Sequence, residues 1–532
     1  MAERTFLRGA MILTGAGLLV KIAGSVNRIL LSRFLGGEGI GLYQMAYPVY
    51  LLLSAVSSAG IPVAISIVMA GRLAVGDRAG AQKAFKISLI AMLCAGFFFS
   101  ALLYWSAGWL VGQHIIRDAR AYYALVALTP AVFFATALAS MRGYFQGFQQ
   151  MLPTAVSQIV EQLLRVAAML FLAWQLFDYG LAYAAAGAAF GAVPGTAGGL
   201  LVLLFFYWRR DSVAPPAAKE TPQAWPLAKQ LAKLALPVSL ANIMIPLVSS
   251  VDALIVPARL EAAGFTVREA TALFGYLTGM ALPLVMMAVI PTTSLATSLV
   301  PAVSESYALA DAAALRGITN MAARLASAIT VPCFFGLAVL AEPVSLLLYG
   351  TPNAALCIKI MAAAIFFLGL QQVTAAVLQG MGRAGAPMGN MLASALVKAG
   401  LTWSLTALPA WGIAGAAWAS VVDFALSAFL NLVFLYKYTG FLYPVQAAAR
   451  IFAAAGLMAF CAREVYQLAF WATAANGFAA VSAILAGGFA YLLLLPLMGC
   501  VTRAEAAGLP VLGHWLIKIF AVRDKLWTNR EN

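Results

Sequence analysis

The sequence predicts an all-α integral membrane protein with about 14 transmembrane helices. Of its 532 residues, 63% are apolar and only 10% are charged, and the mean hydropathy is +0.91. A soluble domain is about half apolar and about a quarter charged. Apolar windows of about 20 residues, the length that crosses about 30 Å of hydrocarbon, recur along the whole chain. No segment between them is long enough for a soluble domain, so function must reside in the membrane.

Each helix is predicted from an apolar window that ends at charged, Gly-rich or Pro-rich residues. The first six windows lie at 10–31, 43–69, 86–111, 122–141, 154–176 and 181–207. The other eight lie at 230–255, 271–300, 320–348, 355–380, 388–409, 412–437, 448–470 and 477–499. The first window has no small-residue cleavage site, so we expect a retained helix and not a signal peptide. The segment GGEGIG (36–41) lacks the Lys-Ser/Thr ending of a phosphate-binding loop and is predicted to be a tight turn.

Two similar halves are predicted from the chain's internal pattern. GIPVAIS (60–66) is echoed by VIPTTSLATSLVPAVSES (289–306), and FQGFQQMLP (145–153) by LQGMGRAGAP (378–387), both at an offset of about 230 residues. The longest hydrophilic break falls between the copies. Because a six-helix unit is even, both copies would enter the membrane in the same sense. The excess of Lys and Arg in alternate loops favours cytoplasmic placement of both termini.

The predicted organisation therefore has five parts. They are an N-terminal six-helix bundle (1–208), a cytoplasmic linker (209–229), a C-terminal six-helix bundle (230–440), two further helices (441–500) and a cytoplasmic amphipathic tail (501–532).

No catalytic constellation is apparent, so we expect a protein that is not an enzyme and has no cofactor. The two histidines, His114 and His514, have no neighbours at metal-ligand or triad spacing. The net charge is +14, but the basic residues are dispersed among short loops, which argues against nucleic acid as a partner.

Charges inside the predicted spans are the informative residues. Lys21 and Arg28 are seven residues apart and share one face of the first helix, with Arg33 at its outer end. Exposing each charge to lipid costs at least about 2.5 kcal/mol, so we expect these side chains to face protein or a water-filled cavity. Glu161 precedes Arg165 by four residues, the order that favours an ion pair. Such cations either fix the packing of the bundle or line an electropositive cavity for an anionic headgroup.

Lys398 follows Arg165 at the offset of the repeat, so each half carries a basic residue at a corresponding position. We include it, with Arg165, among the candidate substrate contacts. An oxygen-rich cation site is a second hypothesis, with Asp252, Asn390 and Ser394 as its ligands. The alternative for Asp252 is a carboxylate paired with a basic partner or lining water.

The segment VKIAGSVNRILLSRFLGGEGIGLYQMAYPVYLLLSAVSSAGIPVAIS (20–66) resembles the amino-terminal signature of the stage V sporulation protein B (SpoVB) family of polysaccharide biosynthesis and export proteins. That family belongs to the multidrug/oligosaccharidyl-lipid/polysaccharide (MOP) exporter superfamily, with the MurJ-type lipid II flippases and the MATE drug antiporters. The resemblance implies two six-helix bundles in a V around a central cavity, with helices 13 and 14 beside them.

The resemblance also implies roles for particular residues. Lys21 and Arg28 occupy positions comparable to the basic residues that meet the pyrophosphate in MurJ-type members, and helices 13 and 14 would form a groove for the polyprenyl tail. Helix two departs from that pattern because LLLSAVSSAG (51–60) has no arginine, which puts lipid II itself in doubt. Asp252, Asn390 and Ser394 match the Na+ site of some members only in part.

We therefore expect a flippase that moves an anionic polyprenyl-pyrophosphate-linked saccharide from the inner to the outer leaflet by alternating access. Its expected setting is the bacterial cytoplasmic membrane, as a monomer among lipids, with Na+ or H+ coupling and cell-envelope synthesis enzymes as candidate partners. A cation-coupled antiporter is the alternative, and it predicts a cavity dominated by carboxylates. A non-transporting scaffold is a third, and it predicts no penalty when the charges are neutralised.

Overall fold

The computed structural model describes residues 2–58, 60–209 and 224–500. Every regular element in these ranges is helical, which confirms the predicted all-α class. The linker is described only in part, and the predicted tail 501–532 lies outside the described residues.

The helices pack into two units, Met1–Gly279 and Met280–Asn532. The first unit holds, in chain order, α1 Ala2–Ser58, α2 Ile61–Ala74, α3 Arg78–Gly112, α4 Ala121–Gly147, α5 Met151–Gln175, the 3-10 turn Phe177–Tyr179, α6 Leu181–Phe190, α7 Ala192–Trp208, α8 Ala224–Ala262 and α9 Val267–Gly275. The helices α8 and α9 pack against α1. The bundle boundaries expected from the sequence stay a prediction.

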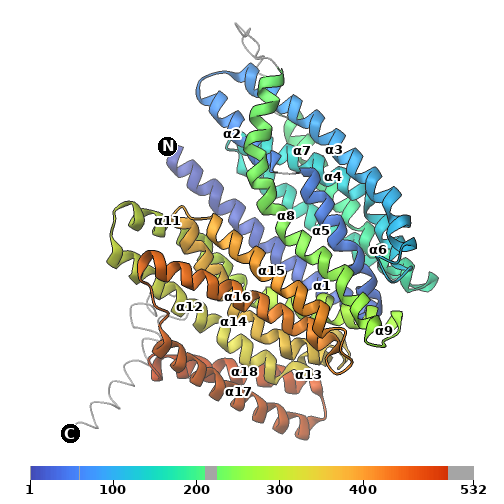
Figure 1. The fold of residues 1–532 in the computed structure, drawn as a ribbon, viewed down its shortest axis with the longest axis vertical. Helices are drawn as coiled ribbons and strands as arrows, with labels where there is room; N and C mark the ends of the chain where they lie inside the picture. Colours follow the sequence, from blue (N-terminus) through green and yellow to red (C-terminus); the bar gives the residue numbers. More distant parts are fainter. Residues whose placement is uncertain (1, 59, 210–223, 501–532) are drawn as a thin grey trace. The chain divides into compact units, whose positions relative to one another are not determined.

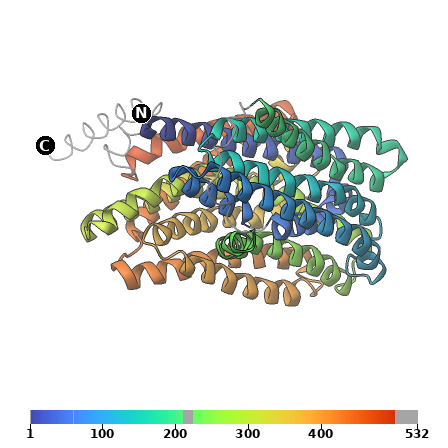
Figure 2. The ribbon, with the colours of Figure 1, turned by 90° about the horizontal axis from the view of Figure 1, so that it is seen from above.

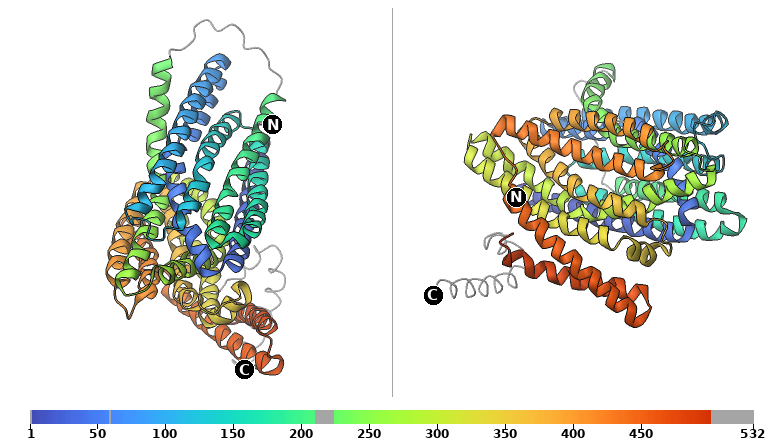
Figure 3. Two further views of the ribbon diagram at one scale, coloured as in Figure 1. Left: turned by 90° about the vertical axis from the view of Figure 1, so that its right-hand side faces the viewer. Right: turned by 60° about the horizontal axis from the view of Figure 1, so that its bottom comes forward.

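The second unit begins within a π-helical segment, Tyr276–Ala281. It holds α10 Leu282–Ala288, α11 Ile290–Ala308, α12 Ala312–Val339, α13 Ala341–Tyr349, α14 Ala355–Gly380, α15 Gly385–Leu405, α16 Gly412–Thr439, α17 Val445–Thr473 and α18 Asn476–Leu497. Here α14 packs against α11, α12 and α16, while α17 and α18 lie side by side and α17 packs on α12 (Figure 3).

Twelve helical runs among the described residues are long and apolar enough to cross a membrane, so the expected count of 14 is not confirmed. The first of these twelve runs spans residues 15–74 and is a single run even though the chain bends within it at Gly36. The helix α15 is not counted because buried polar residues on it lower its hydropathy. Figure 2 shows that, within each unit taken by itself, the long helices run side by side.

The predicted turn at 36–41 is sharper than expected. Only Gly36 leaves helical geometry, with φ 67° and ψ −177°, a combination that is open essentially to glycine. The predicted helix 43–69 is likewise interrupted, because Gly60 adopts the left-handed conformation and Pro62 lies in the first turn of α2. The predicted helix 271–300 is divided among α9, the π-helical segment, α10 and α11, and Pro283 and Pro291 lie in the first turns of the last two helices.

The core of each unit is apolar and small-residue rich. In the first unit, α2, α3, α4 and α7 bury a cluster around Ile65, Met69, Phe85 and Phe145. In the second unit, one cluster gathers around Val303 and Val377, and another lies between α12, α17 and α18 around Ile451.

Candidate functional site

The bend at Gly36 folds the second arm of α1 back along the first. As a result, the Arg28 guanidinium carbon lies 5.9 Å from the centre of the Tyr47 ring. Lys21 and Arg33 are exposed, whereas Arg28 is half-buried. Among the described residues, no ion pair includes Arg28. Arg28 is therefore a membrane-embedded cation that is available to an anionic ligand.

Three tyrosines extend from Arg28 along the second arm of α1. Tyr43 and Tyr47 stack with ring centres 5.1 Å apart, and Tyr47 and Tyr50 follow at 5.6 Å. Their spacing of four and three residues places them on one face of the helix. Tyr50 and Glu161 of α5 line one cavity. A line of aromatic rings thus joins the cation of α1 to the charged residues of α5.

Glu161 accepts hydrogen bonds from two arginines on different helices. Arg165, one turn later on α5, donates to one carboxylate oxygen, and Arg142 of α4 donates to the other across 2.7 Å. Arg142 also donates to Ser157 across 3.1 Å. The three charged side chains are between 16% and 20% exposed, so the ion pairs are formed in a largely desolvated setting.

Arg142 was missed by the sequence analysis. The apolar window ends at residue 141, which suggested that the next residues leave the helix, but α4 continues to Gly147. The glycines of α7 help to build the same site. A Cβ added to Gly195 would lie 2.8 Å from the Arg165 Cβ, and one added to Gly199 would lie 3.1 Å from the Glu161 Cβ.

A cavity of about 330 Å³ opens beside this ion-paired group. Its lining comes from α1, α2, α4, α5, α7 and α8 and includes Tyr50, Arg142, Gln146, Glu161 and Asn242. This volume lies at the lower end of the range of about 300–1,000 Å³ that is typical of small-molecule sites. The cavity is therefore a binding-site candidate wholly inside the first unit.

Three of the remaining predicted site residues, Asn390, Ser394 and Lys398, are buried on α15 of the second unit. Asn390 donates to Asn431 across 2.9 Å, and Ser394 donates to Asp423 across 2.6 Å, which joins α15 to α16. Lys398 is buried two turns after Asn390 on α15. Asp252 lies half-buried on α8 of the first unit.

No group of three or more His, Cys, Asp or Glu side chains among the described residues could hold a metal ion. The cation site of Asp252, Asn390 and Ser394, and the role of Lys398, remain predictions.

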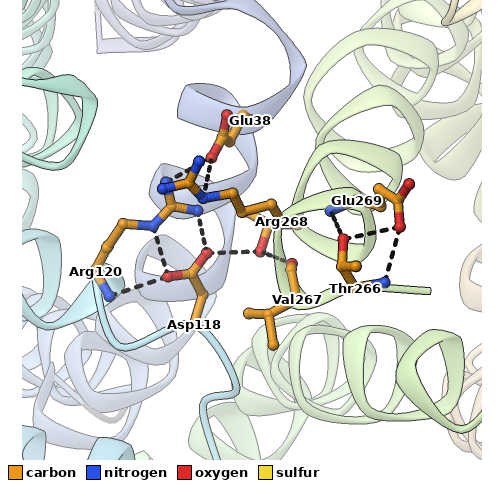
Figure 4. A network of polar contacts seen from close by, with 8 residues as sticks. Glu38, Asp118, Arg120, Thr266, Val267, Arg268 and Glu269 are labelled. Atoms are coloured by element: carbon orange, nitrogen blue, oxygen red, sulfur yellow. Dashed lines mark hydrogen bonds and ion pairs between the residues drawn. The ribbon is translucent and has the colours of Figure 1, made fainter. Parts of the chain in front are cut away.

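A second ionic network in the first unit ties α1 to α9 near the bend at Gly36 (Figure 4). Arg120 donates to Glu38 across 2.5 Å and to the two Asp118 oxygens across 2.6 and 3.0 Å. Thr271 of α9 donates to Asp118 across 2.9 Å. Burial alone would raise the pKa of Asp118, but the hydrogen bonds from Arg120 and Thr271 outweigh it and lower the pKa. The hydrogen bond from Arg120 to Asp118 raises the pKa of Arg120 in turn.

Glycines let the helices meet closely beside this network. A Cβ on Gly41 would lie 2.1 Å from the Thr271 carbonyl oxygen, and one on Gly275 would lie 2.0 Å from the Gly37 carbonyl oxygen. Ser32 also donates to the Gly279 carbonyl across 2.9 Å. We call Glu38, Asp118, Arg120 and Thr271 the α1–α9 latch.

Comparison with known proteins gives one consistent family. Residues 6–307 match the family described as polysaccharide biosynthesis protein. Stage V sporulation protein B of Bacillus subtilis (strain 168) is 32% identical over 97% of this chain and 100% of its own length. Lipid II flippase MurJ of the same organism is 26% identical over 82% of this chain and 84% of its own length. A solved structure of lipid II flippase MurJ, in an inward closed conformation, covers 91% of this chain and 98% of that chain with a TM-score of 0.66 and 15% identity.

Proposed function

Because this chain belongs to the polysaccharide biosynthesis protein family, we propose that it is a flippase for an anionic lipid-linked saccharide. It would move a polyprenyl-pyrophosphate-linked sugar from the inner to the outer leaflet by alternating access, with no covalent chemistry. Similarity to a protein named lipid II flippase supports the class of transport, while the sugar itself is left open.

Arg28 carries the proposal. It lies in a membrane-spanning segment, is half-buried, and has no carboxylate partner among the ion pairs of the described residues. A charged residue in a span is costly and is retained where it meets a ligand or a partner charge. A guanidinium offers several donors in a planar fork, which matches phosphate oxygens. Lys21 lies two helical turns before Arg28 on α1 and would add a point charge. Arg33, Arg165 and Lys398 are further proposed contacts of the substrate.

The direction of transport follows from charge if the interior is negative. Moving one unit of negative charge outward is then favoured by about 2.3 kcal/mol per 100 mV. We propose a monomer in the bacterial cytoplasmic membrane, with both termini cytoplasmic and envelope-synthesis enzymes as partners. Coupling to Na+ or H+, with Asp252, Asn390 and Ser394 as ligands, is part of the same proposal.

Reconstitution tests it. Purified protein is placed in liposomes that contain a fluorescent undecaprenyl-pyrophosphate saccharide, and its appearance in the outer leaflet is measured. Replacing Arg28→Gln removes a charge-assisted contact worth about 1.5–3 kcal/mol, so the rate should fall at least about tenfold. Lys21→Gln should also lower the rate. Arg316→Gln is the matched control, because Arg316 is exposed and, among the described residues, hydrogen-bonds to Ala312 of its own helix. Wild-type rates in the Arg28 and Lys21 variants would contradict the proposal.

A further inference from the structure

The charged residues that line the cavity beside Glu161 are ion-paired, whereas Arg28 belongs to no ion pair of the described residues. The two charged lining residues of the cavity, Arg142 and Glu161, already bond to each other across 2.7 Å, and the second Glu161 oxygen accepts from Arg165. A phosphate entering this cavity would meet an arginine whose charge the Glu161 carboxylate already balances, and it would lie next to that carboxylate. Like charges at such distances repel strongly in a desolvated site, so the cavity disfavours the pyrophosphate.

Apart from the ion-paired Arg142 and Glu161, the polar groups of the described lining are neutral. Gln146 and Asn242 each offer an amide donor and an amide acceptor, and neither amide has a hydrogen-bond partner among the described residues. The hydroxyls of Ser58 and Thr196 donate to carbonyls of their own helices across 2.7 and 2.8 Å, which leaves their lone pairs as acceptors. Mixed neutral donors and acceptors from several directions complement the hydroxyl groups of a sugar ring.

Position connects this cavity to Arg28. Tyr50 lines the cavity, its ring centre is 5.6 Å from that of Tyr47, and Arg28 lies over Tyr47 at 5.9 Å. Arg28 is thus connected to the cavity through two neighbouring rings, those of Tyr47 and Tyr50. In a lipid-linked saccharide the pyrophosphate and the first sugar are joined directly, so one molecule can reach both places.

We infer that the cavity of Gln146, Asn242, Ser58 and Thr196 is a sugar subsite, which binds the first neutral sugar unit while the pyrophosphate lies at Arg28. This inference rests on the proposed function, because it assigns the two parts of one substrate to two places. The Glu161 carboxylate then acts as a positioning and selectivity residue: it pairs with Arg142, the basic residue of the described lining, and so leaves that lining without net charge.

Two substrates separate this inference from the proposed function. Liposomes contain either bare undecaprenyl pyrophosphate or the same carrier bearing one N-acetylhexosamine, and outer-leaflet appearance of each is measured with the full chain. The wild-type protein should move the sugar-bearing carrier several-fold faster than the bare one. In Gln146→Leu that preference should fall about fivefold, the effect of one lost neutral hydrogen bond.

Asn242→Ala is the second variant. Asn242 is exposed on α8, so the substitution leaves the core intact and should also reduce the preference for sugar. Gln379→Leu, an exposed glutamine of α14, is the matched control and should keep the wild-type ratio. The sugar subsite would be overturned if the wild-type protein moved the two carriers at equal rates, or if the ratio of the two rates stayed unchanged in both variants. Either result would leave the proposed flippase function unaffected. Transport of neither carrier by the wild-type protein would overturn the proposed function and the subsite with it.

Discussion

Arg120 donates to Glu38 across 2.5 Å although 82 residues separate them in the sequence. The same guanidinium donates hydrogen bonds to both carboxylate oxygens of Asp118, and Asp118 also accepts a hydrogen bond from the Thr271 hydroxyl. One side chain therefore links the bend of α1, the segment before α4 and the first turns of α9.

Removing that guanidinium should loosen the α1–α9 latch. In Arg120→Ala the buried Asp118 carboxylate loses its cation, and we expect a loss of about 1.5–3 kcal/mol in stability, seen as a lower Tm in thermal unfolding of the purified protein. Arg117→Ala is the control. Its ion pair with Glu261 spans 3.7 Å at a more exposed position, so the loss should stay below about 1 kcal/mol. Equal Tm values for the two variants would show that the latch adds nothing.

The latch should also weaken in acid. The folded protein lowers the pKa of Asp118 below its ordinary value of 3.8, so its contribution is complete above that value and is lost as the pH falls through the lowered pKa. Thermal stability should therefore decline on the acid side more steeply in the wild-type protein than in Asp118→Asn. If the Tm of the two proteins fell equally steeply with decreasing pH, the proposed contribution of the Asp118 carboxylate would be contradicted.

The close approach of α1 and α9 predicts a glycine-specific effect. Gly41→Ala should destabilise the protein by about 1–3 kcal/mol, because the new methyl group would lie 2.1 Å from the Thr271 carbonyl oxygen. Gly400→Ala, in the interior of α15 with no atom within 4 Å of the added Cβ, should be neutral or stabilising by up to about 1 kcal/mol. Comparing the Tm of the two variants checks the argument, and the opposite order would refute it.

The aromatic contact of Arg28 can be tested separately from its charge. Tyr47→Leu removes the ring under the guanidinium, which is worth about 0.5–2 kcal/mol, so flipping should slow by about 2- to 30-fold. Tyr47→Phe keeps the ring and should retain most of the rate. If both variants slow equally, the Tyr47 hydroxyl and not the ring face is the important group.

Much of the fold follows from local sequence. Apolar windows indicate the membrane helices because each span must satisfy its own backbone hydrogen bonds. The Glu161 and Arg165 contact follows from helical spacing, since both residues lie on α5. The sharpness of the bend at Gly36 did not follow, because six neighbouring residues, GGEGIG, include four glycines and only one adopts a positive φ.

The partners across helices could not be read from the sequence. Arg142 reaches Glu161 from α4, and Arg120 reaches Glu38 from the segment before α4, so no fixed spacing marks either pair. The pairing of Ser394 with Asp423 has the same origin, because α15 and α16 meet only in the folded unit. A charge inside an apolar window signals that a partner or a ligand exists, and tertiary packing decides which.

The most direct test of the account compares two cargoes in one reconstituted system. Wild-type protein is supplied with a fluorescent undecaprenyl-pyrophosphate saccharide or with a fluorescent cationic amphiphile, and movement of each across the bilayer is followed with the interior negative. The account predicts outward movement of the lipid-linked saccharide above that in empty liposomes, its loss in Arg28→Gln, and no movement of the cationic compound. Transport of the cationic compound, with none of the lipid-linked saccharide, would contradict the account and indicate an antiporter.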